Sequence, residues 1–192
     1  MAKEVEIKFR IADVRALTRA LKRAGFRQIT RSTHEMNVLY DEAGQKLRKR
    51  GELLRLRQYG EKWVLTHKAK GIAGRHKVRM ERETAVEDGR QMDGILRALE
   101  FLPTFRYEKF RAEWSDGKGH VVLDRTPIGD FGEIEGPPLW IDRTATLLGI
   151  AREDYITQTY AQLFFEWKRR TGSAAAEMTF RVVPSKGGPR RR

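Results

Sequence analysis

Charged and apolar residues alternate with a period of two near the start of the chain, over residues 4–11. This period is typical of a β-strand, in which successive side chains point to opposite faces. One face of the strand is apolar, and a helix layer can cover it. The other face is charged throughout, with Glu4, Glu6, Lys8 and Arg10. For a single strand, exposure to water is the simplest interpretation of such a face, but recurrence on other strands argues against it.

The same alternation returns in later segments of the chain. Arg55 and Arg57 alternate with leucines, and a second alternating run follows the turn at Gly60, so residues 53–70 predict a β-hairpin. Further strands are predicted at 77–84, 106–113, 121–124 and 131–135, and a long irregular strand at 26–40. A charged face thus recurs on six predicted strands.

Helical spacing of apolar residues predicts four helices that would cover the apolar faces of the strands. In the first helix Asp13 is the expected N-cap and Gly25 the expected stop. A second helix is predicted around residues 92–99, and Asp142 is expected to cap a third. A fourth helix carries an aromatic stripe over residues 160–167, which we interpret as core packing.

Two segments are predicted to have no regular structure. Residues 45–51 are rich in lysine and arginine and are interpreted as a solvated loop. From residue 171 the composition shifts to Gly, Ser, Ala and Pro, and the chain ends in three arginines, as is typical of a disordered tail. The expected organisation is therefore one domain at residues 1–170 and a disordered basic tail at 171–192.

The composition limits the partners and the chemistry. Lys plus Arg outnumber Asp plus Glu by 39 to 26, and the net charge of +13 favours polyanionic partners. The absence of cysteine excludes a disulfide scaffold, a thiolate metal site and a cysteine nucleophile. No stretch resembles a signal peptide, and no apolar run approaches the roughly 18 residues of a membrane span. We therefore expect a soluble cytoplasmic protein without a membrane partner.

The alternation places eight cationic and seven acidic side chains on the charged faces. They are Glu4, Glu6, Lys8, Arg55, Arg57, Lys68, Lys77, Arg79, Glu81, Glu83, Lys109, Arg111, Asp124, Glu133 and Glu135. Nothing on an open, water-facing sheet requires so dense and nearly balanced a set. A barrel with this face inside and its apolar face under helices does explain it. The predicted fold class is α+β, a closed antiparallel β-barrel with a charged interior and flanking helices.

Burying an ion costs several kcal/mol unless the ion is paired, hydrogen-bonded or bound to a metal. Arginine and lysine suit phosphate oxygens, while clustered carboxylates suit magnesium or manganese ions. Both kinds of side chain on one face predict a site for a metal ion and a phosphate chain. With one divalent ion, the set comes close to balancing a fully ionised triphosphate.

Several of these segments resemble motifs of the CYTH family, also called triphosphate tunnel metalloenzymes. The first is a Glu-x-Glu-x-Lys signature at residues 4–8, and the others are Leu-Arg-Leu-Arg at 54–57, Thr-His-Lys at 66–68, Arg-Met-Glu-Arg-Glu at 79–83, Lys-Phe-Arg at 109–111, Leu-Asp at 123–124 and Glu-Ile-Glu at 133–135. The resemblance extends from Glu4 to about Trp167. It implies an eight-stranded antiparallel tunnel, a triphosphate-bearing substrate and one or two magnesium or manganese ions.

The resemblance also implies a role for each charged residue. Glu4, Glu6, Glu133 and Glu135 would hold metal, with Glu81, Glu83 and Asp124 as ligands or supports of ligands. The residues that would bind phosphates are Lys8, Arg55, Arg57, Lys68, Lys77, Arg79, Lys109 and Arg111. Of these, Lys8, Arg57, Lys68 and Arg111 would be catalytic, because they would neutralise charge that develops on the phosphates. Glu83, Lys77 and Arg79 could instead pair with one another.

The length and the segments 129–137 and 159–164 are most similar to family members assigned as class IV adenylyl cyclases, which convert ATP to cyclic AMP and pyrophosphate. Triphosphatases acting on inorganic or thiamine triphosphate share the same anion-binding machinery and use water as nucleophile. A non-enzymatic binder of nucleic acid or polyphosphate would explain the cations but not the carboxylates, which repel a polyanion unless a metal intervenes. We expect a nucleoside triphosphate or other small triphosphate as partner and no specific nucleic acid. A homodimer is left open.

Overall fold

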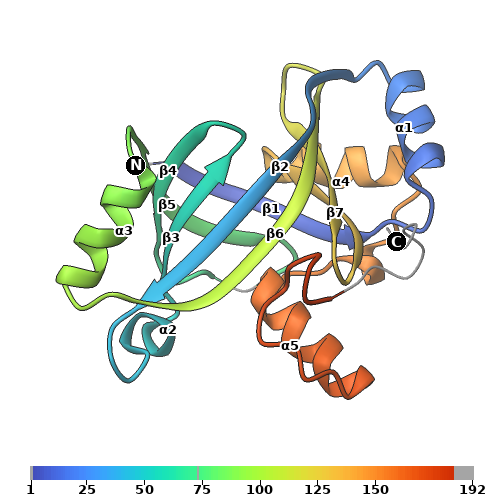
Figure 1. Ribbon diagram of the computed structural model, residues 1–192. Coiled ribbons are helices and arrows are strands. Elements are labelled where there is room, and N and C mark those ends of the chain that lie inside the picture. Colours follow the sequence, from blue (N-terminus) through green and yellow to red (C-terminus); the bar gives the residue numbers. More distant parts are fainter. Residues whose placement is uncertain (1, 73, 184–192) are drawn as a thin grey trace.

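The structure is a computed structural model that describes residues 2–72 and 74–183 (Figure 1). Its strands are β1 (Ala2–Arg10), β2 (Arg27–Asp41), β3 (Leu53–Tyr59), β4 (Lys62–Lys68), β5 (Lys77–Val86), β6 (Leu102–Ser115), β7 (His120–Thr126) and β8 (Gly129–Glu135). Its helices are α1 (Val14–Arg23), α2 (Lys46–Arg50), α3 (Gly89–Ala98), α4 (Pro138–Leu147) and α5 (Tyr160–Thr171), with a 3₁₀ turn at Arg152–Asp154. Each segment that was predicted as a strand from its alternation is a strand.

The strands close into a barrel in the order β1-β5-β4-β3-β2-β6-β7-β8, and the described pairs are all antiparallel. The predicted α+β fold with a closed eight-stranded barrel is therefore confirmed. The long strand β2 shifts register at three places along β6, which agrees with the irregular strand expected at 26–40. Such bulges bend a strand and help a sheet to close.

Helices cover the outer face of the barrel on two sides (Figure 1). On one side, Leu21 of α1 and Ile141 of α4 pack against Ile7 and Phe9 of β1, so the first helix covers the first strand as predicted. The Asp13 carboxylate caps α1 by accepting hydrogen bonds from the backbone of the first turn. On the other side, α3 packs through Leu96 onto the outer faces of β2 and β3.

The barrel interior is charged along only part of its length. Phe105 and Tyr107 of β6 precede Lys109 by four and two residues, so all three share the face that points inward. In Figure 1, α5 lies below the barrel. Its Tyr160 and Phe164 pack against these aromatic residues, with ring centroids 5.3 Å apart for Phe105 and Phe164. We call these side chains, together with Phe131 and Leu163, the aromatic plug. The helix predicted at 160–167 is thus confirmed, and it closes one end of the tunnel.

Two local predictions are wrong. Residues 46–50 form the short helix α2 rather than a loop, because the carboxylate of Asp41 accepts hydrogen bonds from the backbone N–H groups of Leu47 and Arg48. Asp142 does not cap a helix, since α4 begins four residues earlier at Pro138. A proline at the first helical position favours that earlier start. The Asp142 side chain instead binds His76.

The predicted disordered tail is ordered where the structure describes it. Beyond α5, Met178 exchanges backbone hydrogen bonds with β6, accepting from Glu108 at 3.0 Å and donating to Arg106 at 3.1 Å. Met178 is fully buried beside the aromatic plug, and Val183 is nearly so. The glycine-, serine- and alanine-rich composition concealed these few apolar residues, which complete the core. Residues 184–192 of the predicted tail lie outside the described residues. Among the residues described, no helix is both long and apolar enough to cross a membrane.

The packing of Met178 leads to a stability prediction. Met178→Ala should lower the free energy of unfolding by about 2–4 kcal/mol, because it removes a fully buried side chain and leaves a cavity. Val182→Ala is the matched control, since Val182 lies in the same segment but is exposed, and should change stability by less than about 0.5 kcal/mol. Urea unfolding of the two variants measures both values. Equal stability of the two variants would show that the segment does not belong to the core.

Candidate functional site

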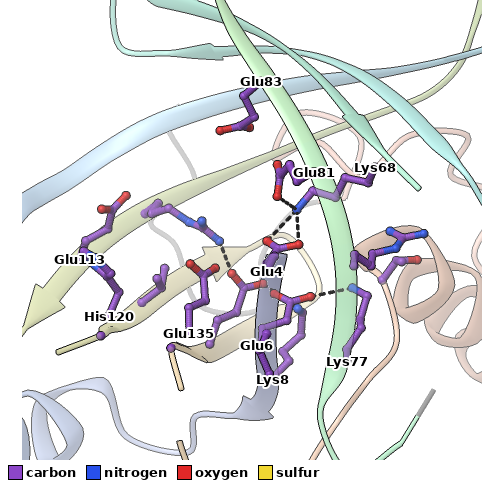
Figure 2. Close-up of a pocket in the computed structure, with 18 of the residues that line it drawn as sticks. Glu4, Glu6, Lys8, Lys68, Lys77, Glu81, Glu83, Glu113, His120 and Glu135 are labelled. Atoms are coloured by element: carbon purple, nitrogen blue, oxygen red, sulfur yellow. Dashed lines mark hydrogen bonds and ion pairs between the residues drawn. The ribbon is translucent and has the colours of Figure 1, made fainter. Parts of the chain in front are cut away.

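The charged part of the barrel interior encloses a cavity of about 630 Å³, a size typical of small-molecule sites (Figure 2). Ten cationic and seven acidic side chains line it. They are Lys3, Lys8, Arg55, Arg57, Lys68, Lys77, Arg79, Lys109, Arg111 and Lys118, and Glu4, Glu6, Glu81, Glu83, Glu113, Glu133 and Glu135. The structure thus brings together all of the predicted site residues except Asp124, which is buried in the wall behind the cavity.

Three carboxylates meet at one corner of this cavity. Glu6 of β1 lies opposite Glu135 of β8 in the strand register, and Glu4, two residues before Glu6, shares the same face of β1. Oxygens of the three side chains all lie within 4.8 Å of one another, and Figure 2 shows the side chains pointing toward one another. We call Glu4, Glu6 and Glu135 the carboxylate corner.

The carboxylate corner fits a divalent cation. A hard ion such as magnesium binds oxygen ligands at about 2.0–2.1 Å, so opposite ligands lie about 4 Å apart. Glu135 makes no ion pair with any described residue, and burial together with the neighbouring carboxylates Glu133 and Glu6 raises its pKa to about 8. Glu6 differs, because Lys8 and Lys77 outweigh the effect of burial and lower its pKa to about 2. A cation in the corner would compensate the charge that Glu135 carries when ionised.

Glu133 was predicted to join the metal ligands, but the structure places it elsewhere. Its carboxylate accepts a hydrogen bond from Lys8 Nζ at 2.6 Å and another from Arg111. Although burial opposes ionisation, these cations hold the pKa of Glu133 well below its usual range. Both oxygens of Glu133 are bound to cations, and Glu133 is not one of the three carboxylates that meet at the corner.

The other three predicted acidic residues also bind cations of the protein. Glu81 pairs with Lys68 at 3.0 Å, and Glu83 pairs with Arg55 and Arg57 at 3.3 Å each. Asp124 accepts hydrogen bonds from Lys109, Arg111 and the hydroxyl of Tyr160. These contacts hold the long cationic side chains in place along the cavity wall.

Among the buried cations of the cavity, Arg79 stands apart. Lys77 pairs with Glu6 at 2.6 Å and Lys68 with Glu4 at 2.7 Å. Arg79 makes no ion pair with a described residue. Its guanidinium donates to the carbonyl of Gly51 at 2.8 Å, and its buried Nε has no hydrogen-bond partner. A buried guanidinium without a carboxylate partner has donor capacity left for an incoming anion.

Glu35 of β2 was not recognised from the sequence. It is fully buried beneath the cavity, 3.5 Å from Lys109 Nζ and 3.9 Å from nitrogens of Arg57 and Arg111. These cations overcome the effect of burial and lower its pKa to about 2. The alternation of Glu35 with Asn37 in a predicted strand was the available signal, but the irregularity of that strand obscured it. Tyr160 was also missed, because its aromatic stripe was assigned wholly to the core.

The sequence matches the family model of the CYTH domain over residues 2–160. The chain belongs to the CYTH domain family. This match confirms the resemblance seen in the motifs, and it covers every strand of the barrel. The residues beyond 160, including most of α5 and the segment around Met178, lie outside the matched region.

Several proteins of other organisms are similar to this chain. A protein of Methanocaldococcus jannaschii named "Putative adenylate cyclase" is 28% identical over 171 residues, which cover 83% of this chain and 97% of that protein. A Vibrio parahaemolyticus structure, also described as a putative adenylate cyclase, has a TM-score of 0.74 at 17% identity and covers 84% of this chain and 97% of its own. The Hippeastrum protein HpAC1, a putative adenylyl cyclase described as having a dominant triphosphatase activity, has a TM-score of 0.64 at 18% identity over 85% of this chain and 95% of its own. At these identities, the two structures support the fold of the chain.

The buried carboxylate of Glu35 predicts a pH-dependent loss of stability. Glu35→Gln should lower the free energy of unfolding by about 3 kcal/mol at pH 7, because three cations lose a buried anionic partner. The folded-state pKa of about 2 lies below the ordinary 4.5, so the wild-type advantage is complete above pH 4.5 and disappears as the pH falls toward 2. Urea unfolding of wild type and Glu35→Gln at several pH values measures this difference in the free energy of unfolding. Glu113→Gln is the control, because Glu113 lines the cavity and, among the described residues, is bound by the hydroxyl of Tyr59 alone; it should change stability by less than about 0.5 kcal/mol.

Substitution of Glu133 and of Glu135 by glutamine should change the free energy of unfolding in opposite directions when a chelator is present. Glu133→Gln should destabilise the protein by about 3 kcal/mol, because Lys8 and Arg111 lose a buried partner. Glu135→Gln should stabilise the protein by about 1–3 kcal/mol at pH 8, because a neutral amide replaces a carboxylate whose charge is disfavoured by burial and by Glu133. Because the folded-state pKa of Glu135 is raised to about 8, this gain should grow from pH 4.5 to pH 8.

Thermal melts with and without manganese complete this comparison. Manganese should raise the melting temperature of wild type, because an ion that binds the folded state stabilises it. The rise should be lost in Glu135→Gln. If Glu135→Gln retained the full manganese effect, the carboxylate corner would not be the metal site.

Proposed function

We propose that this chain is a metal-dependent enzyme acting on a small triphosphate, with conversion of ATP to cyclic AMP and pyrophosphate as the first candidate reaction. The observation that carries the proposal is the presence of a three-carboxylate corner and a wall of cations in one cavity. Carboxylates alone would repel a triphosphate, and cations alone would not need the corner. A phosphate chain with a divalent ion requires both.

The carboxylate corner would hold magnesium or manganese through Glu4, Glu6 and Glu135. When bound there, such an ion polarises phosphate oxygens and neutralises part of their charge. The guanidinium groups of Arg55 and Arg57 and the ammonium group of Lys68 converge from β3 and β4, which pair directly. Arginine can bind two phosphate oxygens at once, whereas lysine acts as a point charge. Together they would orient the phosphate chain and stabilise charge that develops in the transition state.

In the cyclase reaction, the ribose 3′ oxygen attacks the α-phosphorus of ATP. The bond from that phosphorus to the bridging oxygen of the β-phosphate breaks, pyrophosphate leaves, and the hydroxyl proton is released to solvent. The protein would supply the position of the phosphates and the compensating charge rather than a covalent partner. The names of the Methanocaldococcus and Vibrio proteins favour this candidate.

Hydrolysis of a triphosphate is the second candidate. The same cations would bind the phosphates, but water would attack the terminal phosphorus. The bond from that phosphorus to its bridging oxygen would break, the remaining diphosphate, such as ADP, would leave, and the attacked group would be released as orthophosphate. The described triphosphatase activity of the Hippeastrum protein, which shares the fold, favours this alternative. Identification of the products distinguishes the two reactions: cyclic AMP and pyrophosphate come from cyclisation, and ADP and phosphate from hydrolysis of ATP.

The proposal is tested by incubating the protein with ATP, and separately with inorganic tripolyphosphate, in magnesium or manganese. Chromatography and mass measurement then identify the products. Turnover that stops on addition of a chelator supports the metal-dependent enzyme. Salt-sensitive binding of polyanions without turnover of either substrate would instead support a binding protein and overturn the proposal.

The phosphate-binding role predicts the effect of substitutions at Arg57. Arg57→Ala should reduce kcat/KM by about 10- to 150-fold, equivalent to about 1.5–3 kcal/mol for a lost charged hydrogen bond. Arg57→Lys should recover only part of the loss, since the charge remains but two-point contact is lost. The matched control is Arg82→Ala, because Arg82 is an exposed cation on β5 outside the cavity. Full recovery of activity in Arg57→Lys would argue against two-point contact with phosphate.

A further inference from the structure

Tyr160 lies at the boundary between the aromatic plug and the charged cavity. It is the first residue of α5, it is almost fully buried, and its side chain is part of the cavity lining. Its ring packs edge-on against Phe131, with centroids 5.7 Å apart, and lies 6.0 Å from the ring of Tyr107. The Tyr160 side chain therefore packs against the aromatic core and also borders the charged cavity.

Two buried ammonium groups lie close to the Tyr160 ring. Lys8 Nζ is 4.6 Å from the ring centroid, and Lys109 Nζ is 4.7 Å from it. Both lysines are nearly or fully buried, so they have lost most of their hydration. A cation within about 6 Å of an aromatic face is attracted by the ring, and the attraction is strongest when the cation is desolvated. One side chain thus contributes to holding two like charges at the same wall.

The hydroxyl of Tyr160 acts on the same group of charges. It donates a hydrogen bond of 2.6 Å to Asp124 Oδ2, the oxygen that also accepts from Lys109 Nζ at 2.8 Å. Arg111 binds the same carboxylate. Asp124 therefore keeps Lys109 and Arg111 as partners when the hydroxyl is absent, so the hydroxyl is one of several contacts that orient this carboxylate.

The backbone around Tyr160 is held firmly against the barrel. Thr159 and Gln162 form a reciprocal cap at the start of α5. Ile156 and Lys8 exchange two backbone hydrogen bonds, of 2.7 and 3.0 Å. The segment that carries Tyr160 is thus bonded to the strand that carries Lys8, and the ring and the ammonium group are fixed relative to each other.

We propose that Tyr160 is a positioning residue of the cavity, whose ring holds the ammonium groups of Lys8 and Lys109 at the wall where a triphosphate would bind. The role of these two lysines as phosphate ligands rests on the proposed function. Glu133 and Asp124 would still pair with the two ammonium groups, but without the ring these groups would lose a shared attractive surface and be held less tightly at the wall. The anion site would then be less well organised before the triphosphate arrives, and its affinity would fall.

The alternative is that Tyr160 only fills the core. Phe164 provides the matched control for this, because it lies one turn further along α5, is fully buried in the same plug and is not part of the cavity lining. A purely structural role predicts that substitutions at Tyr160 and Phe164 affect stability alike and leave the affinity for phosphates unchanged.

The test measures the affinity of the full-length protein for inorganic tripolyphosphate by calorimetry, with manganese present, for wild type, Tyr160→Met, Tyr160→Phe and Phe164→Leu. Tyr160→Met keeps an apolar side chain of similar length but removes the ring, and should weaken binding about tenfold or more. Tyr160→Phe keeps the ring and should stay within about threefold of wild type, as should Phe164→Leu. Thermal melts verify that each variant is folded. In steady-state kinetics, Tyr160→Met should raise KM more than it lowers kcat.

Each outcome decides between the possibilities. Wild-type affinity in Tyr160→Met would overturn the positioning role, and so would a loss in Tyr160→Phe as large as that in Tyr160→Met, because the ring would then not be the active part. If Tyr160→Met does not fold, Tyr160→Leu and Tyr160→Phe give the same comparison of ring with no ring. Failure of wild type to bind tripolyphosphate would contradict the proposed function itself and, with it, the inference.

Discussion

Compensation of buried charge is the constraint on which this interior depends. Glu35, Asp124 and Glu133 are almost completely removed from water, and each lies beside two or more of the cations Lys8, Lys109 and Arg111. Leaving one such ion without its partner costs several kcal/mol, so the carboxylates and cations require one another. The result is a preorganised wall of cationic groups, since side chains that are already fixed need little rearrangement when an anion binds.

Within the carboxylate corner, Glu4 and Glu6 pair with Lys68 and Lys77, and Glu135 is the exception to this pattern. Glu135 has no cationic partner among the described residues, and its pKa is raised to about 8. Glu133, only two residues away on the same strand face, is held firmly in its ionised form. A strand thus carries one carboxylate that stabilises the protein and one that becomes favourable only when a cation is present. This division is typical of functional sites, where stability is given up for binding.

The barrel also divides its interior into a dry and a charged part. The aromatic plug fills one end with side chains of β6, β8 and α5, and the segment around Met178 completes this core along the edge of β6. The other end retains the cavity. Close packing elsewhere keeps this shape: a Cβ atom on Gly132 would lie 2.0 Å from the ring of Phe9, so only glycine allows β8 to approach β1 at this point. The glycine in the segment 129–137 therefore has a packing role.

The sequence by itself determined which side chains share a face. In a strand every second side chain points to the same face, and in a helix every third or fourth one does, and neither period depends on the elements packed around it. The strands, the helices α1, α3 and α5, the charged interior and most of the charged residues that line the cavity follow from these local periods. Tertiary structure decided which charges meet. Glu133 and Glu135 have the same spacing as Glu4 and Glu6, yet only closure of the barrel places Glu135 at the corner and Glu133 against Lys8 and Arg111. Glu35, Tyr160 and Met178 gain their roles from partners distant in the chain, and contacts of this kind depend on strand register and on the docking of α5, which a local pattern does not encode.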